Sequence, residues 1–169
     1  TTKTYDDGKL IIGDSVTLSS DFKGTFSLLE NENYSHISAE LGKKAVNLIG
    51  DEDNNYLIGG KGKDTLNGGD NDDILWGGKG NDTLIGGEGA DTFVFRAGEG
   101  NDVISDYSIE DGDMLQILDK KGKEISNPIK KYSFDDDGLT LSIKGGGKLI
   151  LTGISTSATL NVNGASRSF

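Results

Sequence analysis

The sequence contains no cysteine, one proline and a single histidine, His36, and only 33% of its 169 residues are hydrophobic. Without cysteine, the chain can form neither disulfide bonds nor Cys-based metal sites. The hydrophobic content is low for a packed globular domain of this length. No apolar run approaches the roughly 20 residues of a transmembrane helix, so we expect no membrane span. The length suits one domain, or one elongated module with two caps.

Negative charge is in excess. The chain has 28 acidic and 17 basic side chains, which gives a formal net charge of −11. This balance argues against nucleic acids and anionic membrane surfaces as partners, and it favours cations. The sequence begins at Thr1 rather than at methionine, so we expect it to be a fragment of a longer protein.

Glycine, by contrast, is abundant, with 26 residues, and many of these glycines belong to a repeat of nine residues. Besides four regular copies, less regular copies lie at 50–58, 97–105 and 108–116. A two-residue insertion precedes each of the last two. A flexible acidic linker would not keep such a register, so we predict an ordered repeat structure. The four regular copies are GGKGKDTLN (59–67), GGDNDDILW (68–76), GGKGNDTLI (77–85) and GGEGADTFV (86–94).

Each repeat divides into a six-residue turn and a three-residue strand. Glycines at the first, second and fourth positions permit positive φ angles, and Asn71, which replaces one of them, tolerates the same conformation. Strand alternation predicts that the eighth side chain points inward. The sixth position holds Asp64, Asp73, Asp82, Asp91 and Asp102, and the eighth holds Leu66, Leu75, Leu84, Phe93 and Ile104.

An aspartate that ends a glycine turn offers one carboxylate beside several exposed carbonyl groups. Ca²⁺ takes six to eight oxygen ligands of these kinds, whereas Mg²⁺ suits a carbonyl-rich, nearly dry cage poorly. Softer metals would need sulfur or imidazole. One turn cannot enclose an ion but two stacked turns can, so the pattern predicts Ca²⁺ between stacked turns.

The GGxGxDxUx pattern of these repeats resembles the RTX, or hemolysin-type calcium-binding, proteins. The resemblance implies an all-β fold, a right-handed parallel β-roll in which two repeats complete one coil and about three to five Ca²⁺ ions lie between turns two repeats apart. It pairs Asp64 with Asp82, Asp73 with Asp91, Asp82 with Asp102 and, across an insertion, Asp91 with Asp113. It assigns further ligands to the carbonyl groups of Gly59, Gly60, Lys61, Gly62, Gly68, Gly69, Asp70, Asn71, Gly77, Gly78, Lys79, Gly80, Gly86, Gly87, Glu88 and Gly89.

The first copy, at 50–58, departs most from this pattern because Asn55 takes the place of the aspartate. We therefore do not assign an ion between Asn55 and Asp73.

Metal binding is expected to be coupled to folding. Without ions, aligned carboxylates repel one another, and ordering the backbone costs about 1–2 kcal/mol per residue. One inward side chain per repeat, contributing about 1.5–3 kcal/mol, does not offset that cost. We therefore expect the roll to be disordered in a calcium-poor cytosol and to fold after export.

The flanks predict two caps. Residues 1–48 contain short β-rich runs without calcium turns, so we read them as ion-free β coils. Residues 49–116 form the calcium-binding roll. Residues 117–169 form an antiparallel cap, because GLTLSIKGGGKLILTGI predicts a β-hairpin around 145–147. The resemblance implies type I secretion through an uncleaved signal near the C-terminus, for which 158–169 is the candidate.

One face of the roll is more apolar than the other, and we predict that the terminal segments or, less favourably, a partner cover it. Its outward residues are Tyr56, Ile58, Ile74, Trp76, Thr92 and Val94.

Two classes of function remain open. The first is a non-enzymatic calcium-binding module that forms the folding and secretion end of a larger secreted protein. The second is a calcium-dependent adhesin, or a glycan- or protein-binding module, at the bacterial surface. Ice binding is disfavoured because the third positions of the repeats carry charges of irregular sign. We expect no enzyme here, because one histidine without an acid–base constellation supports no catalytic site.

Overall fold

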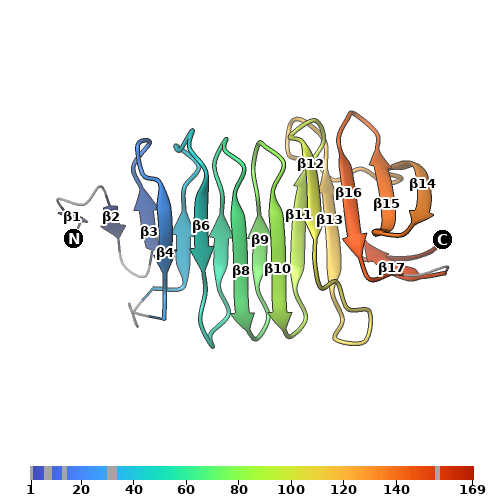
Figure 1. The fold of residues 1–169 in the computed structure, drawn as a ribbon, viewed down its shortest axis with the longest axis horizontal. Helices are drawn as coiled ribbons and strands as arrows, with labels where there is room; N and C mark the ends of the chain where they lie inside the picture. The colour runs from blue at the N-terminus through green and yellow to red at the C-terminus, as the bar shows by residue number, and fades with distance from the viewer. Residues whose placement is uncertain (1, 6–8, 13–14, 30–33, 155–156) are drawn as a thin grey trace.

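The structure is a computed structural model that describes residues 2–5, 9–12, 15–29, 34–154 and 157–169. These residues form strands and turns without a helix, so none of them contributes a helix that could cross a membrane. Figure 1 shows a single elongated coil, with the N-terminal strands at one end and the C-terminal strands at the other.

Two sheets face each other across the core. The first has the strand order β1-β2-β3-β5-β7-β9-β11-β13-β17-β18, and the second has the order β14-β15-β16-β12-β10-β8-β6-β4. In the first sheet the strands are β1 (Thr2–Tyr5), β2 (Lys9–Ile12), β3 (Ser15–Leu18), β5 (His36–Ser38), β7 (Tyr56–Ile58), β9 (Ile74–Trp76), β11 (Thr92–Arg96), β13 (Met114–Leu118), β17 (Thr159–Val162) and β18 (Ala165–Ser168). In the second they are β4 (Gly24–Ser27), β6 (Val46–Ile49), β8 (Thr65–Asp70), β10 (Thr83–Glu88), β12 (Asn101–Ile104), β14 (Ile129–Asp135), β15 (Gly138–Ile143) and β16 (Lys148–Thr152).

The strands of the repeats pair in parallel with a step of two repeats. Leu66 pairs with Leu84, and Leu75 pairs with Phe93, so each coil contains two nonapeptides. The chain is therefore a parallel β-roll, as the resemblance implied. Antiparallel pairs occur at its two ends, among β1, β2 and β3 and among β14 to β18.

The eighth-position side chains point into the core, as predicted, and with residues of the flanking coils they form two continuous columns. Every member of both columns is at most 4% exposed. Because each column is a line of apolar contacts between successive coils, coil stacking buries the apolar surface that a single repeat cannot bury alone. One column is Val16, Ile37, Leu57, Leu75, Phe93, Leu115 and Val162, and the other is Phe26, Leu48, Leu66, Leu84, Ile104 and Leu151.

The three-residue strand length holds at β7 and β9 but is wrong at β8 and β10, which have six residues each. These two strands continue into the next glycine pair, where Gly87 pairs with Gly69 and Glu88 with Asp70. Glycines without a Cβ let the two backbones approach to hydrogen-bonding distance, so the ladder extends into the turn.

The prediction that the terminal segments cover the apolar face is wrong for the described residues. Both ends extend the first sheet at its edges instead of lying over its face. Neighbouring side chains give part of the cover: Arg96 lies 4.4 Å above the Trp76 ring, and the His36 ring lies 4.4 Å from that of Tyr56. Ile74 remains 37% exposed.

Candidate metal centre

Six aspartates are buried at the ends of the turns, although aspartate is rarely buried without a partner. Each is at most 4% exposed: Asp64, Asp73, Asp82, Asp91, Asp102 and Asp113. The turn before each aspartate leads into a strand of one sheet, and consecutive repeats enter opposite sheets. Asp64, Asp82 and Asp102 therefore stack along one edge of the roll, and Asp73, Asp91 and Asp113 along the other.

One carboxylate oxygen of each aspartate fixes the stack. The Oδ1 atom accepts a hydrogen bond from a backbone N–H of the preceding coil, which brings together all four predicted pairs. The donor–acceptor distances are 2.8 Å for Asp64 N to Asp82, 2.9 Å for Asp73 N to Asp91, 3.1 Å for Asp82 N to Asp102 and 2.9 Å for Asp91 N to Asp113.

The second oxygen differs along the stack. The Oδ2 atoms of Asp73, Asp82 and Asp91 are buried without a hydrogen-bond partner. By contrast, Oδ2 of Asp64 accepts the N–H of Gly60 at 2.6 Å, and Oδ2 of Asp113 accepts that of Ser108 at 2.8 Å. A buried carboxylate oxygen without a partner is costly, and a hard cation is a partner for it. The three central aspartates therefore fit a Ca²⁺ ligand set.

The remaining ligands would come from the backbone. No three His, Asp or Glu side chains in the described part of the chain converge on one point. The turns that hold the predicted carbonyl ligands stack directly on each other, and the Gly60 carbonyl accepts the N–H of Lys79 at 2.9 Å. A carbonyl oxygen has a second lone pair, so such a hydrogen bond does not exhaust it. The individual carbonyl ligands stay a prediction.

Asn55 shows what the turn looks like without a carboxylate. Its Oδ1 accepts the N–H of Asp51 at 2.8 Å, and its amide donates to the Asp51 carboxylate at 3.0 Å. Asn55 is only 3% exposed, like the aspartates at the same position. The shape of the turn therefore does not require an aspartate at the sixth repeat position. The aspartates at this position in the other repeats must have a role besides shaping the turn.

Three further polar side chains, which the repeat pattern did not identify, accept backbone hydrogen bonds in the turns. Asp106, in an insertion, accepts the N–H groups of Gly86 and Gly87 at 3.0 and 2.9 Å. Asp72 accepts the N–H of Ala90 at 2.9 Å, and Asn81 that of Asn101 at 2.9 Å. Asp72 and Asn81 share the fifth repeat position, and this recurrence of Asp or Asn was a detectable signal. Asp106 left no such signal, because it lies outside the nine-residue period.

Burial controls the protonation of the aspartates. Loss of solvation raises the pKa of Asp73, Asp91 and Asp102 to about 7 and that of Asp82 to about 8, against the backbone hydrogen bonds that lower it. Neighbouring carboxylates raise it further, for example Asp91 acting on Asp73. A bound cation would have to displace these protons, so calcium affinity should increase as the pH rises through this range.

The metal-free chain should become more ordered on acidification from pH 8.5 to 5.5. The folded pKa values lie above the unfolded value of 3.8, so the folded roll binds protons more tightly than the unfolded chain. This stabilisation is complete below about pH 4 and is lost as the pH rises through 7 to 8. Far-UV circular dichroism of the calcium-free chain at several pH values measures this change in order. A β signal that is unchanged or weaker at pH 5.5 would contradict the expectation.

The RTX calcium-binding nonapeptide repeat, in four copies, matches residues 49–84 and 68–104. No curated protein matches the chain. Repeats of this family bind Ca²⁺ and are typical of secreted bacterial proteins. The matched segment contains the stacked turns and five of the six buried aspartates. Residues 49–104 are therefore an array of RTX calcium-binding nonapeptide repeats.

Proposed function

We propose that this chain is a non-enzymatic module that folds on binding about three to five Ca²⁺ ions outside the cell, as the folding and secretion end of a larger protein exported by a type I system. The observation that carries the proposal is the row of buried aspartates whose second oxygens lack a partner. In the described part of the chain no basic side chain forms an ion pair with these aspartates, so a bound cation would supply the positive charge that their carboxylates lack.

Each part of the turn has a separate role in this proposal. Bound Ca²⁺ would supply positive charge between the stacked carboxylates. The Oδ1 atom of each aspartate sets the spacing of adjacent coils through its backbone hydrogen bond. The Oδ2 atoms of Asp73, Asp82 and Asp91 have no hydrogen-bond partner and are available to ligate. The sites would use Asp64, Asp82 and Asp102 at one edge, and Asp73, Asp91 and Asp113 at the other.

Calcium concentration would determine where the chain folds. Extracellular calcium modules bind at about 0.1–1 mM, far above the level of a calcium-poor cytosol. An unfolded chain can pass through a secretion channel, and folding outside would then prevent its return. The candidate secretion signal, 158–169, contains β17 and β18, and β17 pairs with β13 of the roll. Folding of the roll would thus also order this segment after export.

Two observations favour this function over an enzyme or a glycan receptor. The only histidine, His36, is engaged with the Tyr56 ring at 4.4 Å. Trp76 is a poor platform for a sugar ring, because Arg96 covers one of its faces and its indole N–H donates to Glu99 at 2.9 Å. A glycan array probed in calcium tests the alternative directly: binding that is lost in Trp76→Ala would favour the receptor function.

The test of the proposal is a calcium titration followed by far-UV circular dichroism. We expect a chain that is largely disordered in chelator and gains a β-sheet signal with a midpoint of about 0.1–1 mM Ca²⁺. Mg²⁺ at the same concentrations is the control and should produce little signal, since it demands octahedral geometry and dehydrates reluctantly. A fully ordered roll at pH 8 in chelator would refute the coupling of folding to calcium.

A further inference from the structure

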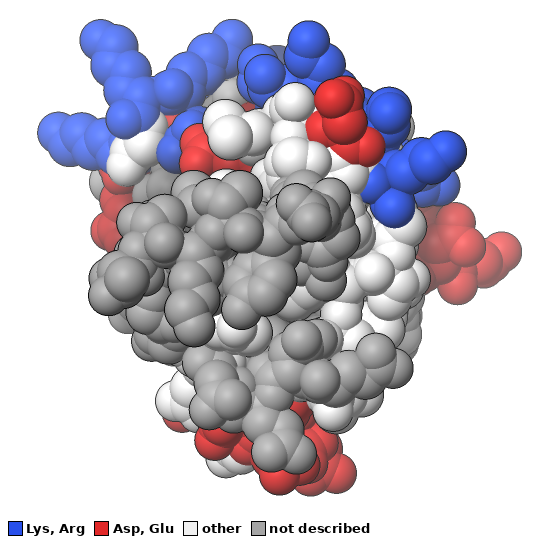
Figure 2. Space-filling view, turned by 90° about the vertical axis from the view of Figure 1, so that its left-hand side faces the viewer, with Lys and Arg blue, Asp and Glu red and all other residues white. Residues whose placement is uncertain are grey.

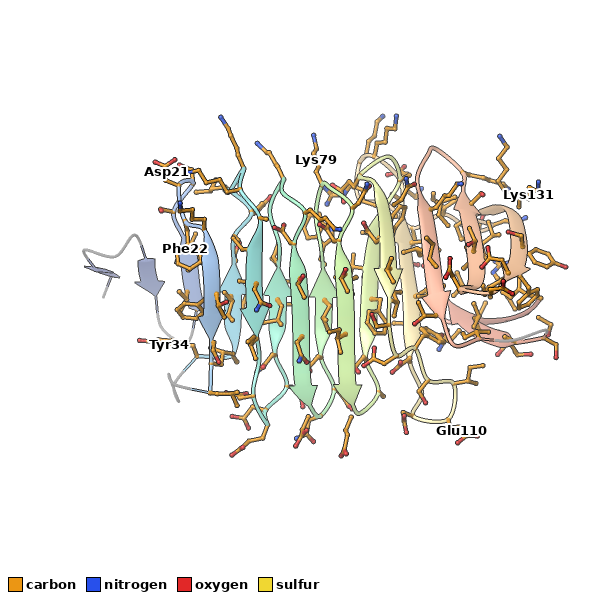
Figure 3. All side chains as sticks on the ribbon, viewed as in Figure 1. Asp21, Phe22, Tyr34, Lys79, Glu110 and Lys131 are labelled. Atoms are coloured by element: carbon orange, nitrogen blue, oxygen red, sulfur yellow. The ribbon has the colours of Figure 1, made fainter. Side chains whose placement is uncertain are left out.

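The two edges of the roll carry opposite charges. The turns at one edge hold lysines, and those at the other hold aspartates and glutamates. Figure 3 shows Lys79 pointing out from the upper edge and Glu110 from the lower edge, and Figure 2, viewed along the roll, shows Lys and Arg gathered at the top and Asp and Glu at the bottom. The third positions of the four regular copies, Lys61, Asp70, Lys79 and Glu88, alternate in sign and are therefore sorted by edge, whereas Glu99, at the third position of the copy at 97–105, is an acidic residue on the same edge as the lysines.

The basic edge, as we define it, is built from the turns that follow strands of the first sheet. Backbone hydrogen bonds stack these turns: Lys61 N donates to Gly42 O at 3.0 Å, and Lys79 N donates to Gly60 O at 2.9 Å. The acidic residues of these turns are Asp21, Glu40, Glu99, Asp119 and Glu124, besides the buried aspartates. Glu99 is occupied by Trp76 and Arg96. The turn at 144–147, after β15, joins this edge because Gly98 N donates to Gly146 O at 2.9 Å. The exposed lysines of the basic edge are Lys23, Lys43, Lys44, Lys61, Lys63, Lys79, Lys120, Lys121, Lys123 and Lys144.

The acidic edge is built from the turns at 50–55, 68–73, 86–91 and 105–113. These turns contain no lysine or arginine. They stack in the same way as the turns of the basic edge, with Asp70 N donating to Asp51 O at 2.9 Å. The exposed acidic side chains of this edge are Glu52, Asp53, Asp70, Asp72, Glu88, Glu110 and Asp111.

We propose that the basic edge of one copy of this chain binds the acidic edge of a second copy. Both edges follow the same coil, so their charges recur with the same spacing of about 4.8 Å between strands, and the two ranks can meet over several turns. Each edge also exposes large apolar side chains: Leu41 is 61% exposed beside the lysines, and Leu29 and Ile109 are 64% and 49% exposed beside the acids. Apolar contacts within a charged rim are the usual composition of a protein interface.

The contact joins two different surfaces, so it leaves a free edge on each copy and can extend to further copies, in an open array or in a ring. Calcium would favour the contact in two ways. It folds the roll that aligns each edge, and each bound ion adds two positive charges to a chain whose formal net charge is −11, which reduces the long-range repulsion between copies. The inference rests on the proposed function only in requiring a folded roll.

Sedimentation velocity in millimolar calcium tests the proposal. We expect the weight-average sedimentation coefficient to increase with protein concentration in about 20 mM salt. In about 0.5 M salt the increase should disappear, because the Debye length shortens from about 20 Å to about 4 Å. A monomer at all concentrations in low salt would overturn the proposal. So would a monomer that associates only when an anionic polysaccharide is added, because the basic edge would then serve a polyanion.

Charge reversal distinguishes this contact from nonspecific association. The double variant Lys43→Glu/Lys44→Glu and the double variant Glu52→Lys/Asp53→Lys each change one edge, and each alone should weaken association more than about tenfold, since opposed like charges cost several kcal/mol. A mixture of the two should associate again, because the reversed edges complement each other.

Lys130→Glu/Lys131→Glu is the matched control, since these exposed lysines lie on β14 at the C-terminal end of the roll. It should associate like the unaltered chain. Circular dichroism of every variant in calcium separates a failure to fold, which concerns the proposed function, from a failure to associate. Folded variants whose mixture remains monomeric would contradict the edge-to-edge contact.

Discussion

Asp82→Asn is expected to require at least about 10–100-fold more calcium for folding than the unaltered chain. Loss of a residue that only supports a metal ligand already costs that much affinity, and Asp82 is predicted to be a ligand itself. It lies between Asp64 and Asp102 in the stack, so it belongs to two of the predicted sites. Its Oδ2 atom is buried without a partner, as expected for a ligating oxygen.

Asparagine is the informative replacement because it keeps the shape of the side chain. Its Oδ1 can still accept the N–H of Asp64, and Asn55 already occupies the same position of the first repeat. The variant thus removes the charge and the ligating oxygen but leaves the turn intact. Calorimetric titration with calcium, followed in parallel by circular dichroism, measures the change in affinity and in folding.

Asp64→Asn is the matched control for Asp82→Asn. Both oxygens of Asp64 accept backbone N–H groups, from Val46 at 2.9 Å and Gly60 at 2.6 Å, and Asp64 belongs to only one predicted site. Its substitution should therefore shift the calcium midpoint less. Equal shifts in the two variants would show that Asp82 is not shared, and no shift in Asp82→Asn would remove this row of aspartates from the calcium sites.

The parts of the fold that repeat were predictable from the sequence. The fixed period places equivalents of Asp82 and Leu84 in successive repeats by the same rule, and strand alternation turns both side chains, two residues apart, to the inward side. The structure confirms that both are buried and that they stack on their equivalents two repeats away.

The features that depend on three-dimensional contacts were not predictable in this way. Tyr107 lies in an insertion, yet its hydroxyl donates to the Asp113 carbonyl at 2.7 Å and accepts the N–H of Asn161 at 3.3 Å. No local pattern links residues so far apart. The opposite charges of the two edges were present in the sequence, but they become visible only when odd and even repeats are assigned to different edges.

Gly87→Ala is expected to destabilise the folded roll by about 2–5 kcal/mol, and Gly24→Ala by only about 1–2 kcal/mol. Both glycines have a φ of +108°, so alanine pays the same conformational cost of about 1–2 kcal/mol at either position. The surroundings differ. A Cβ on Gly87 would overlap the carbonyl oxygen of Gly69 in the stacked turn, whereas a Cβ on Gly24 would meet no atom within 4 Å. Overpacking of this kind adds about 1–3 kcal/mol.

Urea unfolding of both variants in saturating calcium measures the difference. Because φ is the same in both glycines, the difference between the two losses in free energy of unfolding reports the close approach of the stacked turns and not the positive φ.

The Gly69 oxygen belongs to the backbone and cannot rotate away as a side chain would, so the overlap with a Cβ on Gly87 is relieved only if the two coils separate. That separation would also move the Asp73 and Asp91 carboxylates apart, because Asp73 N donates to Asp91 at 2.9 Å. Gly87→Ala should therefore also weaken calcium binding, whereas Gly24→Ala should not. Equal losses of stability in the two variants would mean that the turns do not pack closely, and that φ alone explains the glycines of the repeat.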